Sequence, residues 1–225
     1  MHTEGTGFLR ARRPEQKRLR EASILDAARA LALRDGIGSV SLAAIAADIG
    51  MHKSALLKYF GTREEIFLRL AETEWNEWAS ATVAALAAGP SDEDRVVDVL
   101  TRSLVDRPLL CQLLTHSTLT LERNVSLDAV RRSKVAATGA VAAVSDALHR
   151  TLPGFSRDNC FELLGAAGLV SAGLWQVAHP PPVVVALYAE PGLSINLGVQ
   201  AEAGFAASVA RFIRVYLAGL RRTDG

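Results

Sequence analysis

Apolar residues recur at intervals of three and four along almost the whole chain, and this spacing constrains the fold more than any other feature. A long series with these steps is Phe67, Ala71, Trp75, Trp78, Thr82 and Leu86. Such a period places side chains on one face of an α-helix, whereas a half-buried strand alternates every second residue. The sequence therefore predicts an all-α protein of about nine helices.

Glycine, proline and capping residues divide the pattern into helices. Ser41 and Ser91 are suitable N-caps, and Thr62 with Glu65 matches a capping box, in which each side chain accepts the other's backbone N–H. The run 183–188 resembles a strand in composition but has no partner strand, which predicts an extended loop or a turn of helix. The predicted helices cover about residues 14–34, 41–49, 52–59, 62–88, 92–105, 106–124, 126–151, 156–178 and 200–222.

Charge is unevenly distributed along a chain whose net charge is only +1. Residues 10–20 contain six basic side chains and one acidic side chain, Glu15. This pattern predicts a flexible basic arm over residues 1–13, ahead of the first helix. A basic arm suits a polyanion such as DNA, although a solvated chain end fits the same residues equally well at this point.

Several functional classes are disfavoured by what the sequence lacks. The first 20 residues are charged and have no apolar core, so we expect a cytoplasmic protein. The uncharged stretch 163–189 is cut by three prolines, which favours a buried helix and a loop over a membrane span. Cys111 and Cys160 have no metal-site spacing, and no catalytic or cofactor motif appears. We expect no enzyme, no cofactor and no metal.

The window from Ser41 to Ile66 is the most informative part of the chain. It holds two short predicted helices joined by a turn at Gly50, and the second carries Lys53 and Lys58. In a helix-turn-helix the first helix braces the second, which enters the major groove of DNA. Ala46 allows a close helix crossing, and glycine in the turn adopts a backbone conformation that is costly for other residues.

This window resembles the DNA-binding segment of TetR-family regulators. The resemblance rests on residues 41–50, on Leu56, Tyr59 and Phe60, and on residues 62–66, and it extends to about 50 residues with the first helix. It implies a helix-turn-helix domain at about residues 14–61. A helical domain for ligand binding and dimerisation would follow over 62–225.

Carried over position by position, the resemblance implies a set of DNA contacts. Ser41, Tyr59 and Arg63 match phosphate-contacting positions. Lys17 and Arg18 open the first helix, where family members reach the backbone or minor groove. The residues that would face bases or nearby backbone are His52, Lys53, Ser54, Leu57 and Lys58. Three of these depart from the family pattern: His52 replaces serine, Ser54 replaces glycine and Leu57 replaces tyrosine. The departures leave the operator sequence open.

The C-terminal two-thirds of the chain is less informative. Small residues along the helices at about 156–178 and 200–222 allow close approach, and two helices from each of two chains would form a four-helix bundle. The resemblance implies an unknown small-molecule effector. An apolar pocket with a few polar groups is expected from aromatic and polar side chains in this region. The candidates are Trp75, Trp78, Cys111, Thr115, His116, Thr118, Phe161 and Trp175.

The sequence thus predicts a regulator, most simply a repressor, that binds a palindromic operator as a homodimer and is released by an effector. Its partners would be double-stranded operator DNA, a small molecule and a second copy of the chain, with no membrane. The alternative is a small-molecule binding or scavenging protein of the same fold that does not bind DNA. The departures at His52, Ser54 and Leu57 keep this alternative open.

Overall fold

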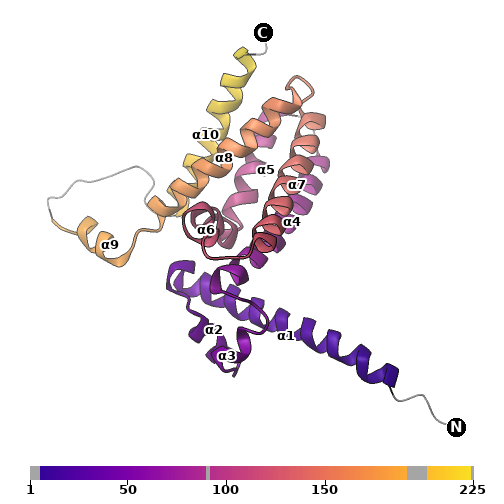
Figure 1. Cartoon of the computed structure of the whole chain (residues 1–225). Helices are drawn as coiled ribbons and strands as arrows, with labels where there is room; N and C mark the ends of the chain where they lie inside the picture. Colours follow the sequence, from indigo (N-terminus) through magenta and orange to yellow (C-terminus); the bar gives the residue numbers. More distant parts are fainter. Residues whose placement is uncertain (1–5, 90–91, 192–201, 224–225) are drawn as a thin grey trace.

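The computed structural model of the chain describes residues 6–89, 92–191 and 202–223, and within these ranges it contains helices and turns but no strand. Figure 1 shows a small group of helices, α1 to α3, below a taller bundle, with the long helix α4 leading from one to the other. The prediction of an all-α protein is confirmed. In the described ranges nine helices have seven residues or more, as the periodicity predicted.

The small unit, called the head below, consists of α1 (Thr6–Asp35), the short 3-10 helix η1 (Ile37–Ser39), α2 (Leu42–Asp48) and α3 (Lys53–Leu56). Residues 6–13, predicted as part of a flexible arm, belong to α1 instead. The segment ahead of Pro14 contains leucine, alanine and arginine, which are good helix formers, so the helix extends beyond the proline.

Helix α4 (Arg63–Ala87) belongs to both units. Its N-terminal half, up to Ala71, is buried in the core of the head, and from Trp78 onward it is buried in the core of the upper bundle. The head's core also takes in Leu109 and Leu113 from the upper bundle. The head is therefore not an independent module that ends at residue 61, because later segments complete its core.

The upper bundle, called the effector domain below, contains seven further elements. They are α5 (Glu93–Val105), α6 (Pro108–His116), the π-type helix η2 (Ser117–Leu121), α7 (Leu127–Thr151), α8 (Arg157–Ala178), α9 (Pro182–Tyr188) and α10 (Glu202–Thr223). Helix α7 packs along α4, and α10 packs on α8 and α5. Asp92 caps α5 by accepting a hydrogen bond from the Arg95 N–H at 2.8 Å. The predicted cap, Ser91, lies outside the described residues.

The predicted helix 106–124 is interrupted near its middle. Helix α6 ends at His116 and continues as the wider η2, and Asn124 then adopts a left-handed φ of 58°. Hydroxyl side chains compete for backbone groups here, since Thr120 Oγ1 donates to the His116 carbonyl at 3.1 Å. This hydrogen bond accompanies the change from α6 to η2.

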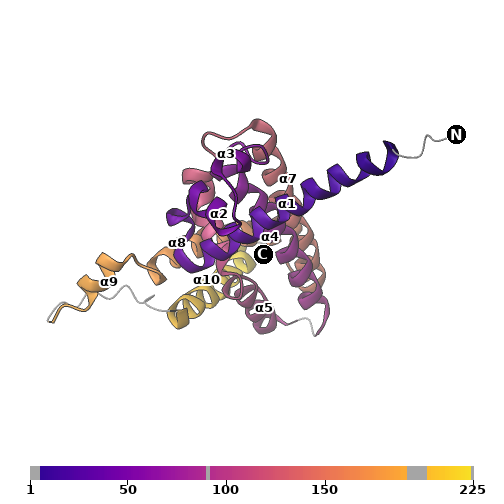
Figure 2. The same ribbon diagram turned by 90° about the horizontal axis from the view of Figure 1, so that it is seen from below.

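Helix α9 projects away from the rest of the molecule in both ribbon views (Figures 1 and 2). The run 183–188, predicted as an extended loop or a turn of helix, forms two turns of helix here, and none of its residues is buried. Helix α8 is long and apolar enough to cross a membrane by length and composition, but it packs against α6, α7 and α10. A core helix of a soluble bundle passes the same test of composition.

Candidate nucleic-acid interface and ligand region

The turn between α2 and α3 fixes the angle between these two helices. Gly50 has a φ of 62°, a conformation that favours glycine, and the Met51 N–H donates to the Ala46 carbonyl at 2.8 Å. Ile45 and Ala46 on α2 and Leu56 on α3 are buried in the same core. Because both helices are anchored through buried side chains, α3 is held rigidly on α2.

The opposite side of α3 faces solvent. Helix α3 proper is one turn long, and further backbone hydrogen bonds carry the turn on to Phe60. Neither lysine of this face forms an ion pair with another described residue, and Leu57 is 41% exposed despite its apolar side chain. The predicted base-facing residues are all exposed: His52, Lys53, Ser54, Leu57 and Lys58.

The two helix caps of the motif behave differently. Ser41 caps α2 by accepting a hydrogen bond from the Ala44 N–H at 3.1 Å, and its side chain is exposed. His52 stands at the N-cap of α3 but makes no capping hydrogen bond. Neutral histidine caps poorly, so the imidazole remains free for another contact.

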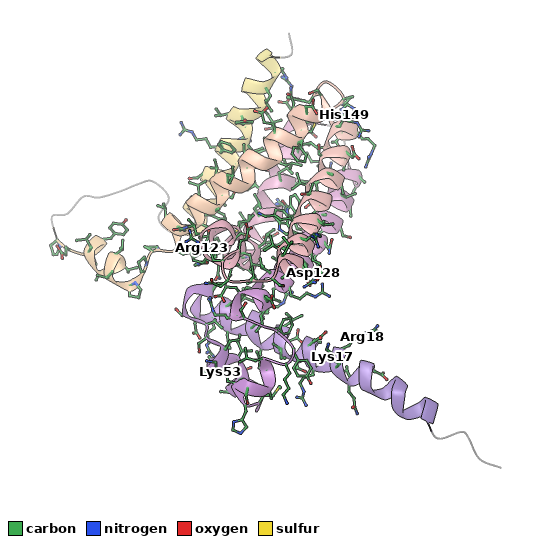
Figure 3. All side chains as sticks on the ribbon, in the orientation of Figure 1. Lys17, Arg18, Lys53, Arg123, Asp128 and His149 are labelled. Carbon is green, nitrogen blue, oxygen red and sulfur yellow. The ribbon has the colours of Figure 1, made fainter. Side chains whose placement is uncertain are left out.

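Basic residues of α1 lie beside the far end of the α3 turn. Tyr59, which is half-buried, lines one shallow depression with Lys17 and Arg20 and another with Arg18. Lys17 pairs loosely with Glu21, its Nζ lying 3.8 Å from the carboxylate. Figure 3 shows Lys17, Arg18 and Lys53 at the same end of the molecule. The cationic side chains of α1 and α3 therefore share one surface.

Arg63, predicted to hold a phosphate, points into the head instead. Its guanidinium donates to the carbonyls of Val40 and Ile37 and pairs with Glu64 at 3.0 Å. It also lies over the Phe67 ring, 5.0 Å from the centroid. Contact between this side chain and DNA would require it to leave these acceptors. In the structure Arg63 ties the start of α4 to the loop ahead of α2.

Two family models together match nearly all the described helices. Residues 24–70 match the model described as "Bacterial regulatory proteins, tetR family", and residues 72–224 match "Tetracyclin repressor-like, C-terminal domain". The chain belongs to the TetR family. The boundary between the two matches falls within α4, where the two cores of this TetR-family regulator also divide. No curated protein sequence matches the chain.

Solved structures of other regulators share this fold. The fatty acid degradation regulator FadR from Bacillus halodurans is 14% identical with a TM-score of 0.57, covering 88% of this chain and 98% of its own. FadR from Bacillus subtilis, in complex with stearoyl-CoA, is 12% identical with the same TM-score and coverage. A putative TetR-family regulator from Mesorhizobium loti is 17% identical with a TM-score of 0.52, covering 90% and 97%. At such identities the likeness concerns the fold alone.

The predicted ligand residues of this TetR-family chain do not gather at one place. Trp75 and Trp78 meet edge to face, with ring centroids 5.4 Å apart, beside an interior void of about 20 Å³. That volume holds no more than a water molecule. Trp78 Nε1 donates to Ser103 Oγ at 3.0 Å, which closes the void toward α5.

Three other predicted residues border a larger cavity of about 660 Å³ between η1, α6 and the end of α8. Thr115 Oγ1 donates to the Ala172 carbonyl at 3.0 Å, and Trp175 stacks on His179 with ring centroids 3.7 Å apart. Burial lowers the pKa of His116 below its ordinary value, and the nearby Arg63 charge acts in the same direction. His116 is therefore held as the neutral imidazole over a wider pH range.

Of the last three predicted ligand residues, Cys111 and Phe161 line neither space. Cys111 is buried, where desolvation raises the pKa of its thiol to about 12, and its Sγ lies 3.3 Å from the Leu104 carbonyl. Phe161 is 46% exposed on α8. The side chain of Thr118 lies outside the described residues. Cys111 is thus a core residue, and Phe161 belongs to an outer surface.

Sequence reasoning missed the polar side chains that join the head to the effector domain. Gln112 of α6 accepts from the Ile37 N–H at 2.9 Å and donates to the Ala32 carbonyl at 3.2 Å. Glu74 of α4, which is buried, pairs with Arg29 of α1 and with Arg107 of α6. A glutamine or glutamate inside an otherwise apolar helix face is the signal that would have identified them.

Glu65 makes a third connection, in place of the reciprocal capping box that the sequence predicted. Thr62 Oγ1 accepts from the Glu65 N–H at 3.2 Å, as expected. The Glu65 carboxylate, however, accepts from the Gly61 N–H at 3.0 Å and from the Ser126 N–H at 2.9 Å. The hydrogen bond from Ser126 lowers the pKa of Glu65, and the start of α7 is thereby tied to the head.

Proposed function

We propose that this chain is a ligand-responsive repressor that binds a palindromic operator as a homodimer. The observation that carries the proposal is the outer face of the α3 turn. Two lysines without an ion pair to any described residue and three further exposed side chains stand there, on a helical turn whose other side is fixed in a core. A rigid, cationic, outward-facing helix fits the major groove of duplex DNA.

Within this proposal, the exposed face of α3 recognises the base sequence of the operator, while other residues position the head on the DNA backbone. Lys53, Ser54 and Leu57 would meet base edges, and Leu57 offers an apolar contact to a thymine methyl group. Lys17, Arg18 and Tyr59 flank this face and would contact phosphates, together with Ser41. Arg63 would act indirectly, by fixing the loop that carries Ser41.

Dimerisation is supported by an exposed surface on α8 and α10. Leu169 is 79% exposed on α8 and Val215 is 64% exposed on α10. Gly165 and Gly173 on α8 would have open space around an added Cβ, so nothing in the described part of the chain requires glycine at these positions. Glycine inside a helix costs about 0.5–1 kcal/mol relative to alanine. A partner helix packed closely on this face accounts for both features.

The response to an effector is supported by the connections between the two units. Gln112, Glu74 and Glu65 link α6, α4 and α7 of the effector domain to α1, η1 and the start of α4 in the head. A ligand that binds one arrangement of these helices more tightly than another shifts the population of head positions. Because two half-sites lie about 34–36 Å apart on DNA, a small shift of each head lowers operator affinity.

Two spaces beside the head are large enough for an effector. The Bacillus subtilis structure in complex with stearoyl-CoA demonstrates that a regulator of this fold accommodates a ligand with a long apolar chain. In this chain the interior void beside Trp75 and Trp78 is closed, and two larger spaces adjoin the head. An effector at either of these spaces would contact both units.

Hydroxyl-radical footprinting on the DNA upstream of the chain's own reading frame tests the proposal. We expect protection of two half-sites with centres about one helical turn, 10–10.5 base pairs, apart or a multiple of that spacing. If the dimeric protein gives no footprint at low salt but still binds small apolar molecules, the scavenging function is the better account.

A further inference from the structure

A groove of about 680 Å³ runs between α4 and α5 and is closed at one end by α1 and by the start of α6. Ser103 borders both this groove and the small interior void, and the hydrogen bond from Trp78 to Ser103 forms the wall between them. The groove therefore lies outside the buried core of the effector domain. It is large enough for a small organic molecule.

The floor of the groove is apolar and partly open to solvent. Ala81 and Ala85 on α4 and Val99 on α5 line its length, and Leu33 of α1 stands at the closed end, about half exposed. The two alanines leave room between the helices that larger side chains would fill. An apolar concave surface of this kind gains free energy when a ligand displaces water from it.

The charges around the groove leave one cation without a counterion. Arg29 and Arg107 are engaged by Glu74, and Arg107 also by Glu77. Arg102 on α5 forms no ion pair with any residue in the described ranges, and its side chain is exposed. Asp106, at the C-cap of α5, also forms no ion pair with a described residue, and its negative charge opposes a high density of further negative charge nearby. This combination favours a ligand that carries a single negative charge.

We propose that the groove binds an amphipathic monocarboxylate, with its apolar body on Ala81, Ala85 and Val99 and its carboxylate at Arg102. Taking this ligand as the effector rests on the function proposed above. The groove is also bordered by Arg29 and Leu33 of α1 and by Arg107, the N-cap residue of α6. A ligand in the groove therefore contacts the junction between the effector domain and the head.

Competition binding with the full-length protein tests the site. Anilinonaphthalene sulfonate, a fluorescent amphipathic anion, is the reporter, and decanoate and decanol are the competitors. We expect decanoate to displace the reporter about tenfold more strongly than decanol does, because a charged hydrogen bond to Arg102 distinguishes the two competitors. In Arg102→Gln this preference disappears, while the weaker displacement by decanol is unchanged.

Two further variants localise the binding. Ala81→Leu, at an exposed position, fills the groove and lowers the affinity for both competitors, whereas Phe161→Ala on the outer face of α8 leaves both unchanged. The inference is overturned if decanoate and decanol compete equally in the wild type, or if Arg102→Gln and Ala81→Leu both bind decanoate as the wild type does.

A DNA-binding measurement separates this inference from the proposed function. Decanoate is expected to lower operator affinity at least several-fold in the wild type and to have little effect in Arg102→Gln, which binds operator normally without ligand. If decanoate binds the groove but leaves operator affinity unchanged, the ligand is not an effector. If the wild type binds no operator at all, the repressor proposal fails while the groove can still be established by competition.

Discussion

The head exposes most of the side chains predicted to meet its partner, whereas the effector domain encloses or scatters those predicted to meet a ligand. The α3 turn carries five such residues between positions 52 and 58, all exposed. In the effector domain Trp78 and Cys111 are buried and Phe161 faces outward, while Trp75 borders one space and Thr115, His116 and Trp175 border another. The predicted contacts of the head thus form an exposed surface, whereas those of the effector domain lie in a core or at separate openings in it.

This difference follows from the physics of the two tasks. The major groove of a DNA duplex has a regular shape, so a short rigid helix with exposed polar side chains can enter it and contact the base edges. A small-molecule site is concave and assembled from several helices, so its residues are distant in sequence. The head therefore depends on a local motif, and the effector domain depends on how α4 to α8 and α10 pack.

The largest expected effect comes from disrupting the proposed dimer surface. Leu169→Glu combined with Val215→Glu places charges on the exposed face of α8 and α10, where desolvation in an interface is unfavourable. We expect a monomer by light scattering and a loss of operator affinity of about 100-fold or more, since one head no longer positions the other. Thr138→Glu, on the exposed side of α7, is the control. A double variant that stays dimeric would place the interface elsewhere.

Removing a buried side chain from the head is the next largest change. Leu56→Ala deletes a fully buried leucine and should lower the free energy of unfolding by about 2–5 kcal/mol. The control, Leu57→Ala, alters a side chain that is 41% exposed and should stay within about 0.5 kcal/mol. Chemical denaturation checks both values. An equally small effect of the two variants would contradict the burial pattern of the motif.

A substitution at the junction between the head and the effector domain should lower the free energy of unfolding by a smaller amount. Gln112→Ala removes two hydrogen bonds and leaves the buried Ile37 N–H unpaired, which should cost about 1–3 kcal/mol. We expect the operator affinity to depend less on effector concentration in this variant. Asn76→Ala, at an exposed position of α4, should change neither property. Unaltered effector response in Gln112→Ala would show that the coupling runs through other contacts.

The smallest predicted effect is the pH dependence contributed by Glu65. Its pKa is lowered in the folded protein because the carboxylate accepts hydrogen bonds from Ser126 and Gly61. The unfolded state therefore takes up a proton first as the pH falls. The stabilisation is complete above the unfolded pKa of about 4.5 and is lost as the pH falls through the folded value.

A glutamine at this position tests that assignment. Glu65→Gln keeps one acceptor oxygen but does not titrate, so its free energy of unfolding should vary less than that of the wild type between pH 6 and pH 3, by up to about 1 kcal/mol. Glu190→Gln, at an exposed position, should follow the wild type. Parallel curves for Glu65→Gln and the wild type would contradict the role given to this carboxylate.

Much of the fold could be predicted because the signals are local. Gly50, Thr62 and the helical spacing of buried residues each act within a few positions, and the structure agrees with them. The missed details are also local: Asp92 stands at the N-cap of α5, where the prediction chose Ser91, and α6 gives way to η2 after His116. Serine and aspartate have similar preferences for an N-cap, so local propensity did not separate these two neighbours.

The functional residues were harder to predict wherever contacts between distant parts of the chain determine the position of a side chain. Arg63 occupies a DNA-contacting position by sequence, yet the carbonyls of Ile37 and Val40 attract its guanidinium inward. Arg102 and Gln112 gave no local signal, because their significance depends on helices that are distant in sequence. Polar residues within apolar helix faces are therefore worth attention before a structure is known.

The salt dependence of operator binding tests the central claim most directly. Plotted as log affinity against log salt concentration, Lys53→Ala with Lys58→Ala should bind at least 100-fold more weakly than the wild type, with a slope reduced by up to about two units. A control that also removes two positive charges, Lys134→Ala with Arg150→Ala on α7, should retain the wild-type slope. If the two double variants give the same affinity and slope, the α3 face does not bind DNA.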